Sequence, residues 1–460
     1  MAELVRRRKL SPVDLVKAHV DKIEEFNPTI NAFVHVEAER ALMQALAAER
    51  AVGRKASKIG PLHGVPISIK SSIDVAGFRC EAGTRLRKGY VPAADAPIVN
   101  RLRSAGAIVL GVTNTPEFLM AWETDNLLYG RTNNPWDLSR TAGGSSGGEA
   151  AAIASGCSAG GVGSDGGGSI RVPAHFCGIC GLKPTPGRIP ATAHFPQSVG
   201  PFALLGVVGP MARTVADVKL LFEAMHGPEF GDPSSAPVPL RWPLSKNRKR
   251  IRIGYFEDDG STAVTPETRT AVRKAAKALR SAGFVVEPFL PEGLAKARDL
   301  WWKIFGGAGG MLLGPMTRSR ESDLSPILRE FNSWVAAENP HTAQTLLDTW
   351  IERDLVRMQV FEQMKEFQVI LCPVASVPAF RHGEREWNIE GRRVKYLDAW
   401  SYCEWFNLLG MPAAVVPVHE SKEGLPIGVQ IVSFPWEEEQ VLAVAEALER
   451  VRGRWKQPPM

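Results

Sequence analysis

The sequence predicts an α/β protein, a single large domain in which helices cover both faces of a mixed, mostly parallel twisted sheet. Short apolar or alternating segments, typical of strands, take turns along the chain with segments of helical period. This alternation is typical of parallel sheets that are covered by helices on both faces. The 460 residues contain no linker-like stretch, so we expect one domain over residues 1–460.

The first half of the chain contains three expected helices and two expected strands. Ser11-Pro12 starts a helix with Ser11 as its N-cap, and Asn27-Pro28 is expected to end it. Lys70 lies near the end of a buried strand that is rich in Val and Ile. The further elements are a helix over residues 37–51, that strand over 65–73, a helix over 96–105 and a strand over 107–112.

The second half contains a βαβ unit. Its strands lie at residues 250–255 and 284–286, and the helix between them begins at Thr265-Pro266 and ends at Gly283. Three further strands are expected at residues 369–372, 413–418 and 429–433, followed by a helix at 437–451. The segment over about residues 291–360 is expected to form a helical cap on a catalytic core of about residues 58–215.

Charge and composition narrow the class of partner. The net charge of +6 arises from 55 basic and 49 acidic residues, which are mostly interspersed. We therefore interpret the basic clusters at residues 6–9 and 246–252 as solvated faces, with binding to an anionic surface as the alternative, and expect no nucleic-acid partner. The nearly apolar run at 204–211 is far shorter than the roughly 18–20 residues of a membrane span, so none is expected.

Six cysteines in 460 residues do not form a disulfide framework, and this usage predicts a reducing, cytoplasmic location. Cys177 and Cys180 form a C-x-x-C pair, but a zinc site would need a second pair, and the sequence has none. We interpret the two as packed small residues. No metal and no cofactor are expected.

Two segments rich in Gly and Ser stand out, GGSSGG at residues 143–148 and GSDGGGSIR at 163–171. A flexible linker is excluded, because apolar, helix-forming residues flank both segments. A phosphate-binding loop would need a Lys after its glycines, and a dinucleotide fingerprint would need an acidic residue about 20 positions later. Neither pattern is complete here.

Two interpretations of these segments remain. GGSSG matches the G-x-S-x-G of an esterase-type nucleophile elbow, with Ser145 or Ser146 as nucleophile, but residues 135–142 do not resemble the strand that an elbow requires. In the other interpretation both segments belong to one site. Successive small residues leave backbone N–H groups free to converge on one point, as in an oxyanion hole, with Ser169 at the end of the run to attack a carbonyl.

On these motifs the sequence resembles the amidase signature family, whose members use a Ser–cisSer–Lys triad. The resemblance rests on LHGVPISIK at residues 62–70, GGSSGG at 143–148 and GSDGGGSIRVP at 163–173. GLKPT at 181–185 and GLPIGVQ at 424–430 are further family-like segments. NLLYGRTNNP at 126–135 and Phe195-Pro196 are most similar to the fatty-acid amide hydrolase branch.

The resemblance implies a role for each site residue. Ser169 is the nucleophile, Ser145 passes its proton and follows a cis peptide bond, and Lys70 is the final base. The N–H groups expected to hold the oxyanion are those of Gly166, Gly167, Gly168 and Ser169. The residues expected to brace the loops, with no chemical step, are Ser146, Asp165 and Arg171.

Lys70 must be neutral to accept a proton, because an ammonium group only donates. Burial must therefore lower its pKa by roughly 2–4 units from the free value near 10.4. The sequence departs from the family pattern in two places: Ser71 stands where Asp is usual, and Gly166 where Ile or Thr is usual. The second departure predicts a looser oxyanion turn or a roomier pocket.

The expected function is hydrolysis of C–N bonds in amides through an acyl-enzyme on Ser169. Aryl amides or anilides, carbamates (urethanes) and esters are candidate substrates, and the aromatic segment at residues 300–350 favours an apolar or aryl group. The alternatives are a component of a tRNA-dependent amidotransferase, a catalytically silent binding module, and an esterase using Ser145 or Ser146. We expect a monomer or homodimer.

Overall fold

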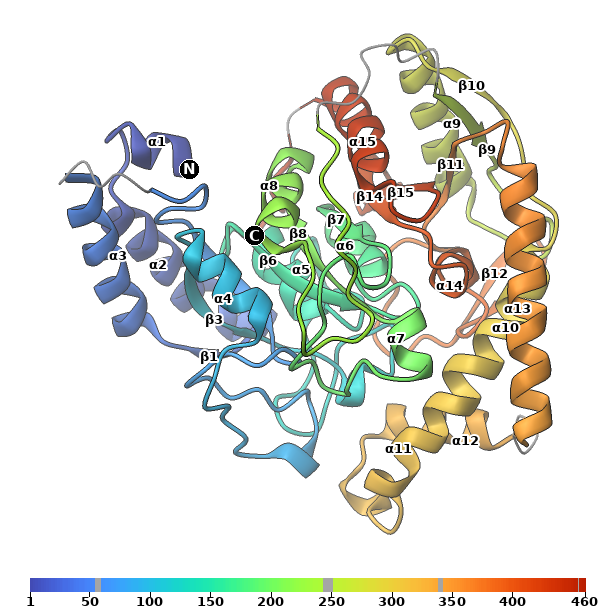
Figure 1. Cartoon of the computed structure of the whole chain (residues 1–460), viewed down its shortest axis with the longest axis horizontal. Coiled ribbons are helices and arrows are strands. Elements are labelled where there is room, and N and C mark those ends of the chain that lie inside the picture. The colour runs from blue at the N-terminus through green and yellow to red at the C-terminus, as the bar shows by residue number, and fades with distance from the viewer. Residues whose placement is uncertain (54–58, 243–250, 338–341, 454) are drawn as a thin grey trace.

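An eleven-stranded mixed sheet runs through the molecule, and helices cover both of its faces (Figure 1). The computed structural model describes residues 1–53, 59–242, 251–337, 342–453 and 455–460. The strands of the sheet are, in chain order, β1 (Phe33–Val36), β2 (Pro66–Lys70), β3 (Ile108–Thr113), β6 (Gly160–Asp165), β7 (Cys180–Lys183), β8 (Val207–Ala212), β9 (Arg252–Tyr255), β10 (Val285–Pro288), β11 (Val369–Pro373), β14 (Ala413–Glu420) and β15 (Pro426–Ser433). The predicted single α/β domain with a mixed sheet is confirmed.

The strand order is β1-β3-β2-β6-β8-β7-β14-β15-β11-β9-β10. Parallel pairing is confined to β3-β2-β6 and β11-β9-β10. The other six neighbour pairs are antiparallel. The expectation that most pairs are parallel was therefore wrong. The two predicted strands β14 and β15 show why: only residues 421–425 separate them, too few for the crossover that a parallel pair needs.

The helices are distributed over the two faces. Those of the chain are α1 (Ala2–Arg6), α2 (Pro12–Ile30), α3 (Ala38–Gly53), α4 (Pro97–Ser104), α5 (Gly147–Ala154), α6 (Arg171–Cys177), α7 (Pro201–Leu205), α8 (Val215–Met225), α9 (Pro266–Ser281), α10 (Leu294–Trp302), α11 (Gly309–Thr317), α12 (Pro326–Ala337), α13 (Ala343–Gln363), α14 (Ser401–Leu408) and α15 (Glu438–Arg452). Helices α4, α8, α9 and α15 contribute to one buried apolar cluster, and α2, α5, α6 and α14 contribute to another. The sheet separates the two clusters.

Helix α2 begins as the sequence predicts. The Ser11 hydroxyl accepts hydrogen bonds from the N–H groups of Val13 and Asp14. The predicted end at Asn27-Pro28 was wrong, because the helix continues through Pro28 to Ile30. Asn31 ends it in a left-handed conformation (φ 50°), and its N–H donates to the Asn27 carbonyl at 2.8 Å. A proline so close to the end removes only one backbone donor, which the helix tolerates.

Residues 135–142 also differ from the expectation. They contain strand β5 (Asp137–Thr141), which pairs with β4 (Asn133–Asn134) in a two-stranded ribbon outside the main sheet. A second ribbon is formed by β12 (Glu386–Ile389) and β13 (Arg392–Lys395). The C-x-x-C pair is confirmed as packed small residues: both thiols are free and buried, Cys177 in one core cluster and Cys180 in the other.

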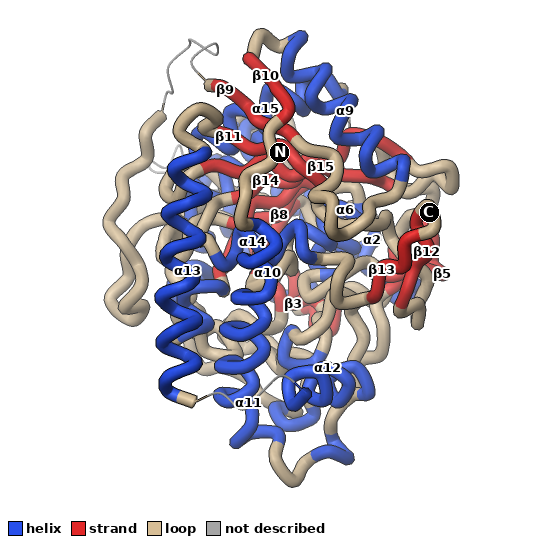
Figure 2. The backbone as a smooth tube through the Cα atoms, turned by 90° about the vertical axis from the view of Figure 1, so that its right-hand side faces the viewer, coloured by secondary structure: helices blue, strands red, loops and turns tan. Residues whose placement is uncertain are grey.

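The expected cap segment is helical in its described part. Helices α10 and α11 are joined by a π-helical turn, η4 (Lys303–Ala308), so that residues 294–317 form one continuous helix. Helices α10 and α13 lie side by side (Figure 2). Residue 58, residues 246–250 of the second basic cluster and residues 338–341 of the cap lie outside the described residues. The boundaries of core and cap remain predictions. Among the described helices, none is long and apolar enough to cross a membrane.

Candidate active site

The site forms where two neighbouring parallel strands end. β2 pairs with β6 in the register Ser68 to Gly161 and Ile69 to Val162. The carboxyl ends of parallel strands meet at the same edge of a sheet, so this register brings Lys70 at the end of β2 next to Ser164 at the end of β6. The sequence prediction of a strand that ends near Lys70 is thereby confirmed.

The Lys70 amine is buried and bonded to two hydroxyl groups. Its side chain is 0% exposed, and Nζ lies 2.6 Å from Ser145 Oγ and 3.0 Å from Ser164 Oγ. Burial lowers the pKa of Lys70 to about 7, against the opposing effect of the carboxylates of Asp165 and Glu149. The prediction that burial lowers the pKa of this lysine far enough for a useful neutral fraction is confirmed.

Ser145 follows a cis peptide bond between Gly144 and Ser145, as predicted. A Cβ atom at position 144 would lie 2.5 Å from the backbone nitrogen of Glu123 and 2.6 Å from the Ala121 carbonyl, so only glycine fits there. Ser145 itself is 1% exposed, and its carbonyl accepts a hydrogen bond from the Thr115 hydroxyl at 2.8 Å. The chain on both sides of the hydroxyl is thus tightly held.

Ser146 links the two glycine-rich segments. Its N–H donates to the Ser169 carbonyl at 3.1 Å, and its hydroxyl donates to the Ser164 carbonyl at 3.2 Å. Both contacts place it against the turn rather than in the cavity, since its side chain is 0% exposed. These contacts fit the bracing role that the family resemblance implies.

Asp165 and Arg171 form a buried ion pair at the base of the turn. Arg171 donates from Nε and Nη2 to the two Asp165 oxygens, each at 3.0 Å. Burial alone would raise the pKa of Asp165, but the Arg171 guanidinium holds it below its usual value. Arg171 also donates to the Cys403 carbonyl and to Gln430 Oε1. The pair therefore ties the turn to α14 and β15.

The backbone of the turn presents three free amide groups. The N–H of Gly168 donates to Asp165 Oδ1 at 2.8 Å, so the expectation that it holds an oxyanion was wrong. The carboxylate of the neighbouring ion pair uses that donor. Within the described residues, the N–H groups of Gly166, Gly167 and Ser169 donate no intramolecular hydrogen bond. These three stay the candidates for the oxyanion hole.

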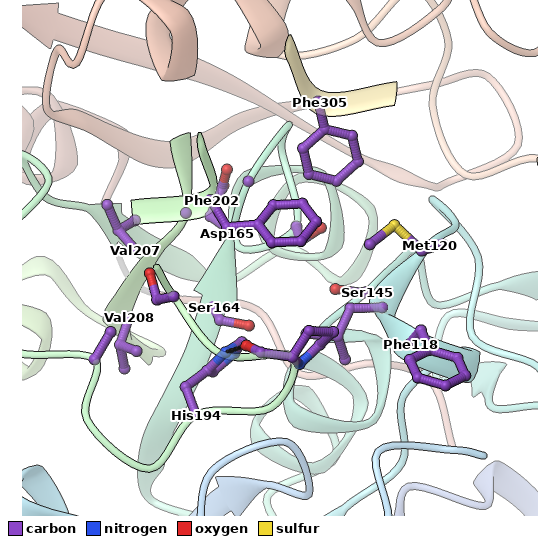
Figure 3. Close-up of a pocket in the computed structure, with 17 residues that line it drawn as sticks. Phe118, Met120, Ser145, Ser164, Asp165, His194, Phe202, Val207, Val208 and Phe305 are labelled. Carbon is purple, nitrogen blue, oxygen red and sulfur yellow. Dashed lines mark hydrogen bonds between the residues drawn. The ribbon is translucent and has the colours of Figure 1, made fainter. Parts of the chain in front are cut away.

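Ser145 and Ser169 both line a cavity, which Figure 3 shows around Ser145. Phe305 and Phe202 lie together on one side of it, and Phe118 and Met120 on another, with Ser145 and Ser164 between them. Its other lining residues include Leu119, Gly166, Ala191, His194, Val207 and Val208. Ser169 is partly exposed to this cavity, whereas Ser145 is buried beneath it. No hydrogen bond joins the two hydroxyls in the described structure. The lining is mainly apolar.

Glu149 is a site residue that the sequence analysis missed. It lies in α5, is 0% exposed, and accepts hydrogen bonds from Ser68 Oγ at 2.5 Å and Thr113 Oγ1 at 2.8 Å. Burial raises the pKa of Glu149 to about 7, against the lowering effect of these two bonds and of Lys70. A signal was present in the sequence: Glu149 is the one charged residue in the otherwise small and apolar helix GGEAAAIA.

The nucleophile-elbow interpretation needs a histidine base. Among the described histidines, His194 lines the cavity, and both of its ring nitrogens are already bonded. Nδ1 lies 2.9 Å from the Pro196 carbonyl and Nε2 lies 3.3 Å from Ser72 Oγ. Burial lowers the pKa of His194 to about 4. The strand β5, although present, ends before Gly143 in a ribbon outside the main sheet. The geometry therefore favours the lysine-based site.

The two departures from the family pattern have different surroundings. Ser71, at the position where Asp is usual, donates its backbone N–H to the Thr113 carbonyl. Asp74, the first carboxylate after Lys70 in the sequence, accepts a hydrogen bond from the Tyr90 hydroxyl at 3.0 Å. Gly166 faces Phe305, which also lines the cavity. In the described part of the chain, no group of three or more His, Cys, Asp or Glu side chains is arranged to hold a metal ion.

Comparison with known proteins gives one consistent result. The model of the family described as Amidase matches residues 14–442. Indoleacetamide hydrolase of Bradyrhizobium diazoefficiens is 35% identical over 98% of this chain and 86% of that protein. Human fatty-acid amide hydrolase 2 is 30% identical over 100% and 89%, and a glutamyl-tRNA(Gln) amidotransferase subunit of Heliobacterium modesticaldum is 30% identical over 98% and 96%.

Solved structures agree with these relatives. A bacterial aryl acylamidase of the amidase signature family superposes with a TM-score of 0.85 at 28% identity, over 98% of this chain and 95% of that one. A fatty acid amide hydrolase superposes with a TM-score of 0.88 at 25% identity, over 99% and 84%. In each case the similarity extends over nearly the whole chain.

Proposed function

The chain belongs to the amidase family, and from this premise we propose that it hydrolyses the C–N bond of amides through an acyl-enzyme on Ser169. The observation that carries the proposal is the buried Lys70 amine, whose pKa is lowered to about 7 and whose nitrogen lies 2.6 Å from Ser145 Oγ. A lysine in this state accepts a proton at neutral pH, which an ordinary surface lysine does not.

The first half-reaction forms the acyl-enzyme. Ser169 Oγ attacks the carbonyl carbon while its proton passes to Ser145 Oγ and the proton of Ser145 passes to Lys70 Nζ. The carbonyl oxygen gains a negative charge, which the free N–H groups of Gly166, Gly167 and Ser169 stabilise. One donor of this kind typically contributes about 10²–10³ in rate.

Collapse of the tetrahedral intermediate breaks the C–N bond. The proton held on Lys70 returns through Ser145 to the leaving nitrogen, so that a neutral amine departs. A water molecule then attacks the acyl-enzyme, gives its proton to Lys70 by the same route, and releases the acid and free Ser169. Every proton that leaves Ser169 or water is taken up by the leaving nitrogen or the restored serine.

For the substrate we propose an apolar or aryl amide. The cavity that contains Ser169 is lined mainly by aromatic and aliphatic side chains, which favour such groups. The names of two similar proteins, an indoleacetamide hydrolase and an aryl acylamidase, also describe amides that carry an aromatic group. Linear amides are the first choice. Carbamates expose a similar carbonyl to Ser169, so urethanase and esterase side activities belong to the same proposal.

A role within a tRNA-dependent amidotransferase is the second candidate, because a component of the glutamyl-tRNA(Gln) amidotransferase is 30% identical over nearly the full length. The two candidates differ in what they need. A self-sufficient hydrolase cleaves an anilide as the purified chain, whereas an amidotransferase component works only with partner proteins, glutamine and ATP. We propose the former, as a monomer or homodimer. The cytoplasmic location and the absence of a nucleic-acid partner stay predictions.

Labelling with a fluorophosphonate tests the proposal. We expect mass-spectrometric mapping to find the label on Ser169, Ser169→Ala to lose it, and Ser145→Ala and Ser146→Ala to keep it at position 169, with slower labelling for Ser145→Ala. A label on Ser145 or Ser146 would support the esterase interpretation instead. Rates on an anilide, an aryl carbamate and an ester with the same acyl group then rank the substrates.

A further inference from the structure

Two tryptophan side chains bind consecutive carbonyl groups of the oxyanion turn. Trp301 Nε1 donates to the Gly166 carbonyl at 2.9 Å, and Trp122 Nε1 donates to the Gly167 carbonyl at 2.8 Å. Trp301 lies at the end of α10, more than 130 positions after the turn, and Trp122 lies before the first glycine-rich segment. The turn is therefore held from outside by two distant parts of the chain.

A bond to a carbonyl also fixes an amide. In a trans peptide unit the C=O and the N–H of the next residue point in opposite directions within one plane. Trp301 holds the Gly166–Gly167 unit by its carbonyl and so sets the direction of the Gly167 N–H, which is one of the three free amides. The unit held by Trp122 ends in the Gly168 N–H, which is already bonded to Asp165. Of the two indoles, Trp301 controls an amide that remains available.

The glycines make this approach possible. A Cβ atom at position 167 would lie 2.4 Å from Trp301 Cζ2, so any side chain there would push the indole away. A Cβ atom at position 166 would lie 3.1 Å from Cε2 of Phe305. Phe305 in turn stacks on Trp301, with ring centroids 4.5 Å apart and planes inclined by 12°. Phe305 thus fills the space that a side chain at position 166 would take.

The stacked rings of Trp301 and Phe305 lie between the hydrophobic core and the cavity. Trp301 is 0% exposed, and its ring also contacts Trp122 and Trp302. Phe305 is only partly buried, since one face borders the cavity, where it packs edge-to-face on Phe202. An indole hydrogen bond in such a dry setting has no water to compete with it, so it holds the peptide unit in one orientation.

We propose that Trp301 is a positioning residue for the oxyanion hole and that Phe305, occupying the place of a side chain at position 166, determines the size of the group accepted beside Ser169. Both residues belong to the helix of residues 294–317, outside the two glycine-rich segments. The helical cap of about residues 291–360 thereby contributes to rate as well as to specificity. This proposal rests on the proposed amide hydrolysis, and its tests separate the two.

The first test removes the N–H donor and keeps an aromatic side chain. Trp301→Phe removes the indole N–H, and Trp302→Phe is the matched control, since Trp302 lies next to it and donates no hydrogen bond to the turn. For Trp301→Phe we expect kcat on an anilide to fall roughly ten- to a hundredfold with KM little changed, because aligning a donor is worth part of what the donor itself contributes. Trp302→Phe should retain kcat within about twofold. Equal losses in both variants, or a change in KM alone, would overturn the positioning role.

A binding measurement distinguishes positioning from general damage. An aryl trifluoromethyl ketone forms a hemiketal oxyanion with the serine, whereas the corresponding secondary alcohol does not. Trp301→Phe should weaken inhibition by the ketone roughly tenfold or more and leave inhibition by the alcohol unchanged, because only the former uses the Gly167 N–H. If both inhibitors weaken equally, the variant has merely disturbed the pocket and the inference fails.

The second test asks whether a side chain at position 166 and the ring of Phe305 compete for the same space. Gly166 has no left-handed φ, so alanine is tolerated by the backbone and meets only the Phe305 ring. We expect Gly166→Ala to slow cleavage of bulky aryl amides, Phe305→Ala to widen the accepted range, and the double variant to recover most of the loss of the single Gly166→Ala. Additive effects in this double-mutant cycle would show that the two positions do not share one space.

The two proposals fail in different ways. If the unaltered protein cleaves no amide, carbamate or ester and no fluorophosphonate labels Ser169, the proposed function is wrong. If the unaltered protein is active and Trp301→Phe behaves like Trp302→Phe, the function stands and the inference about Trp301 is wrong. The Gly166 and Phe305 cycle leaves Trp301 itself unsubstituted, so it remains informative even if Trp301→Phe does not fold.

Discussion

The Lys70 amine and the Ser145 hydroxyl lie 2.6 Å apart, beneath a cavity to which Ser169 is partly exposed. Because only the neutral amine accepts a proton and burial lowers the pKa of Lys70 to about 7, we expect kcat/KM to rise with pH through about 7 and to level off above it. Below that pH the rate should fall about tenfold per unit. A pH profile on an anilide checks this, and a rate that falls as pH rises through 7 would contradict it.

Removal of the base should be more severe than any shift in pH. Lys70→Met keeps an unbranched side chain but has no group that accepts the proton, so we expect kcat/KM to fall by roughly 10²–10⁴. The variant should still fold, because an apolar side chain suits a position that is fully buried. Steady-state kinetics together with circular dichroism would check both statements; near-normal activity would show that Lys70 is not the base.

The carboxylate of Glu149 should influence the pKa of Lys70. Its negative charge raises the pKa of Lys70, so Glu149→Gln should move the acidic limb of the pH profile to lower pH. Glutamine keeps the size of the side chain and can still bond to Ser68 and Thr113. Glu24→Gln, at an exposed position of α2, serves as the control and should leave the profile unchanged. A shift to higher pH for Glu149→Gln would contradict the assignment.

The ion pair of Asp165 and Arg171 should dominate the stability of the turn. Asp165→Asn leaves a buried guanidinium without its counter-charge, and we expect the free energy of unfolding to fall by roughly 3–5 kcal/mol. Asp137→Asn is the matched control, since its bond to Arg140 lies at a half-exposed surface and should be worth less than about 1 kcal/mol. Denaturant titration measures the loss of unfolding free energy in both variants. If Asp165→Asn loses no more than Asp137→Asn, the buried ion pair does not stabilise the turn.

Glu117 should stabilise the contact between the residues that line the cavity and the helical cap. It is 2% exposed and accepts hydrogen bonds from Thr84 Oγ1 at 2.8 Å and from the Ser325 N–H at 2.6 Å, just before α12. Glu117→Ala leaves both donors unpaired, and we expect a loss of roughly 1–3 kcal/mol in unfolding free energy. KM should rise more than kcat falls, because the next residues, Phe118 and Leu119, line the cavity. The exposed Glu321→Ala should change neither quantity.

The parts of the fold that were predictable are those with local signals. The N-caps Ser11 and Thr265 accept the expected backbone bonds, and the βαβ unit of β9, α9 and β10 forms as a parallel pair. Strand β6 was not predicted, because its sequence GGVGSD has a low intrinsic preference for strands. It lies inside the sheet between β2 and β8, where its glycines allow close approach of neighbouring groups. This reason is tertiary, and no local pattern reveals it.

The sequence predicted which side chains meet at the site, but not which backbone groups of the turn are already hydrogen-bonded. Lys70 and Ser145 meet as the motifs implied, but the sequence did not show that Asp165 uses the Gly168 N–H. Nor did it show the bonds from Trp122 and Trp301 to the turn, because both cross long stretches of chain. Hydrogen bonds of this kind depend on the relative placement of elements, which spacing in the sequence does not encode.

The π-helical turn of residues 303–308 makes the shape of the cavity depend on the number of residues in this helix as well as on their type. A π turn contains about one more residue than an α turn, so deleting a single residue there would rewind it as an α turn and displace Phe305, which lies within it. The Phe305 ring would then leave its place in the cavity lining with no exchange of side-chain type. We therefore expect a one-codon deletion in this turn, like a substitution of Phe305, to change the range of accepted substrates.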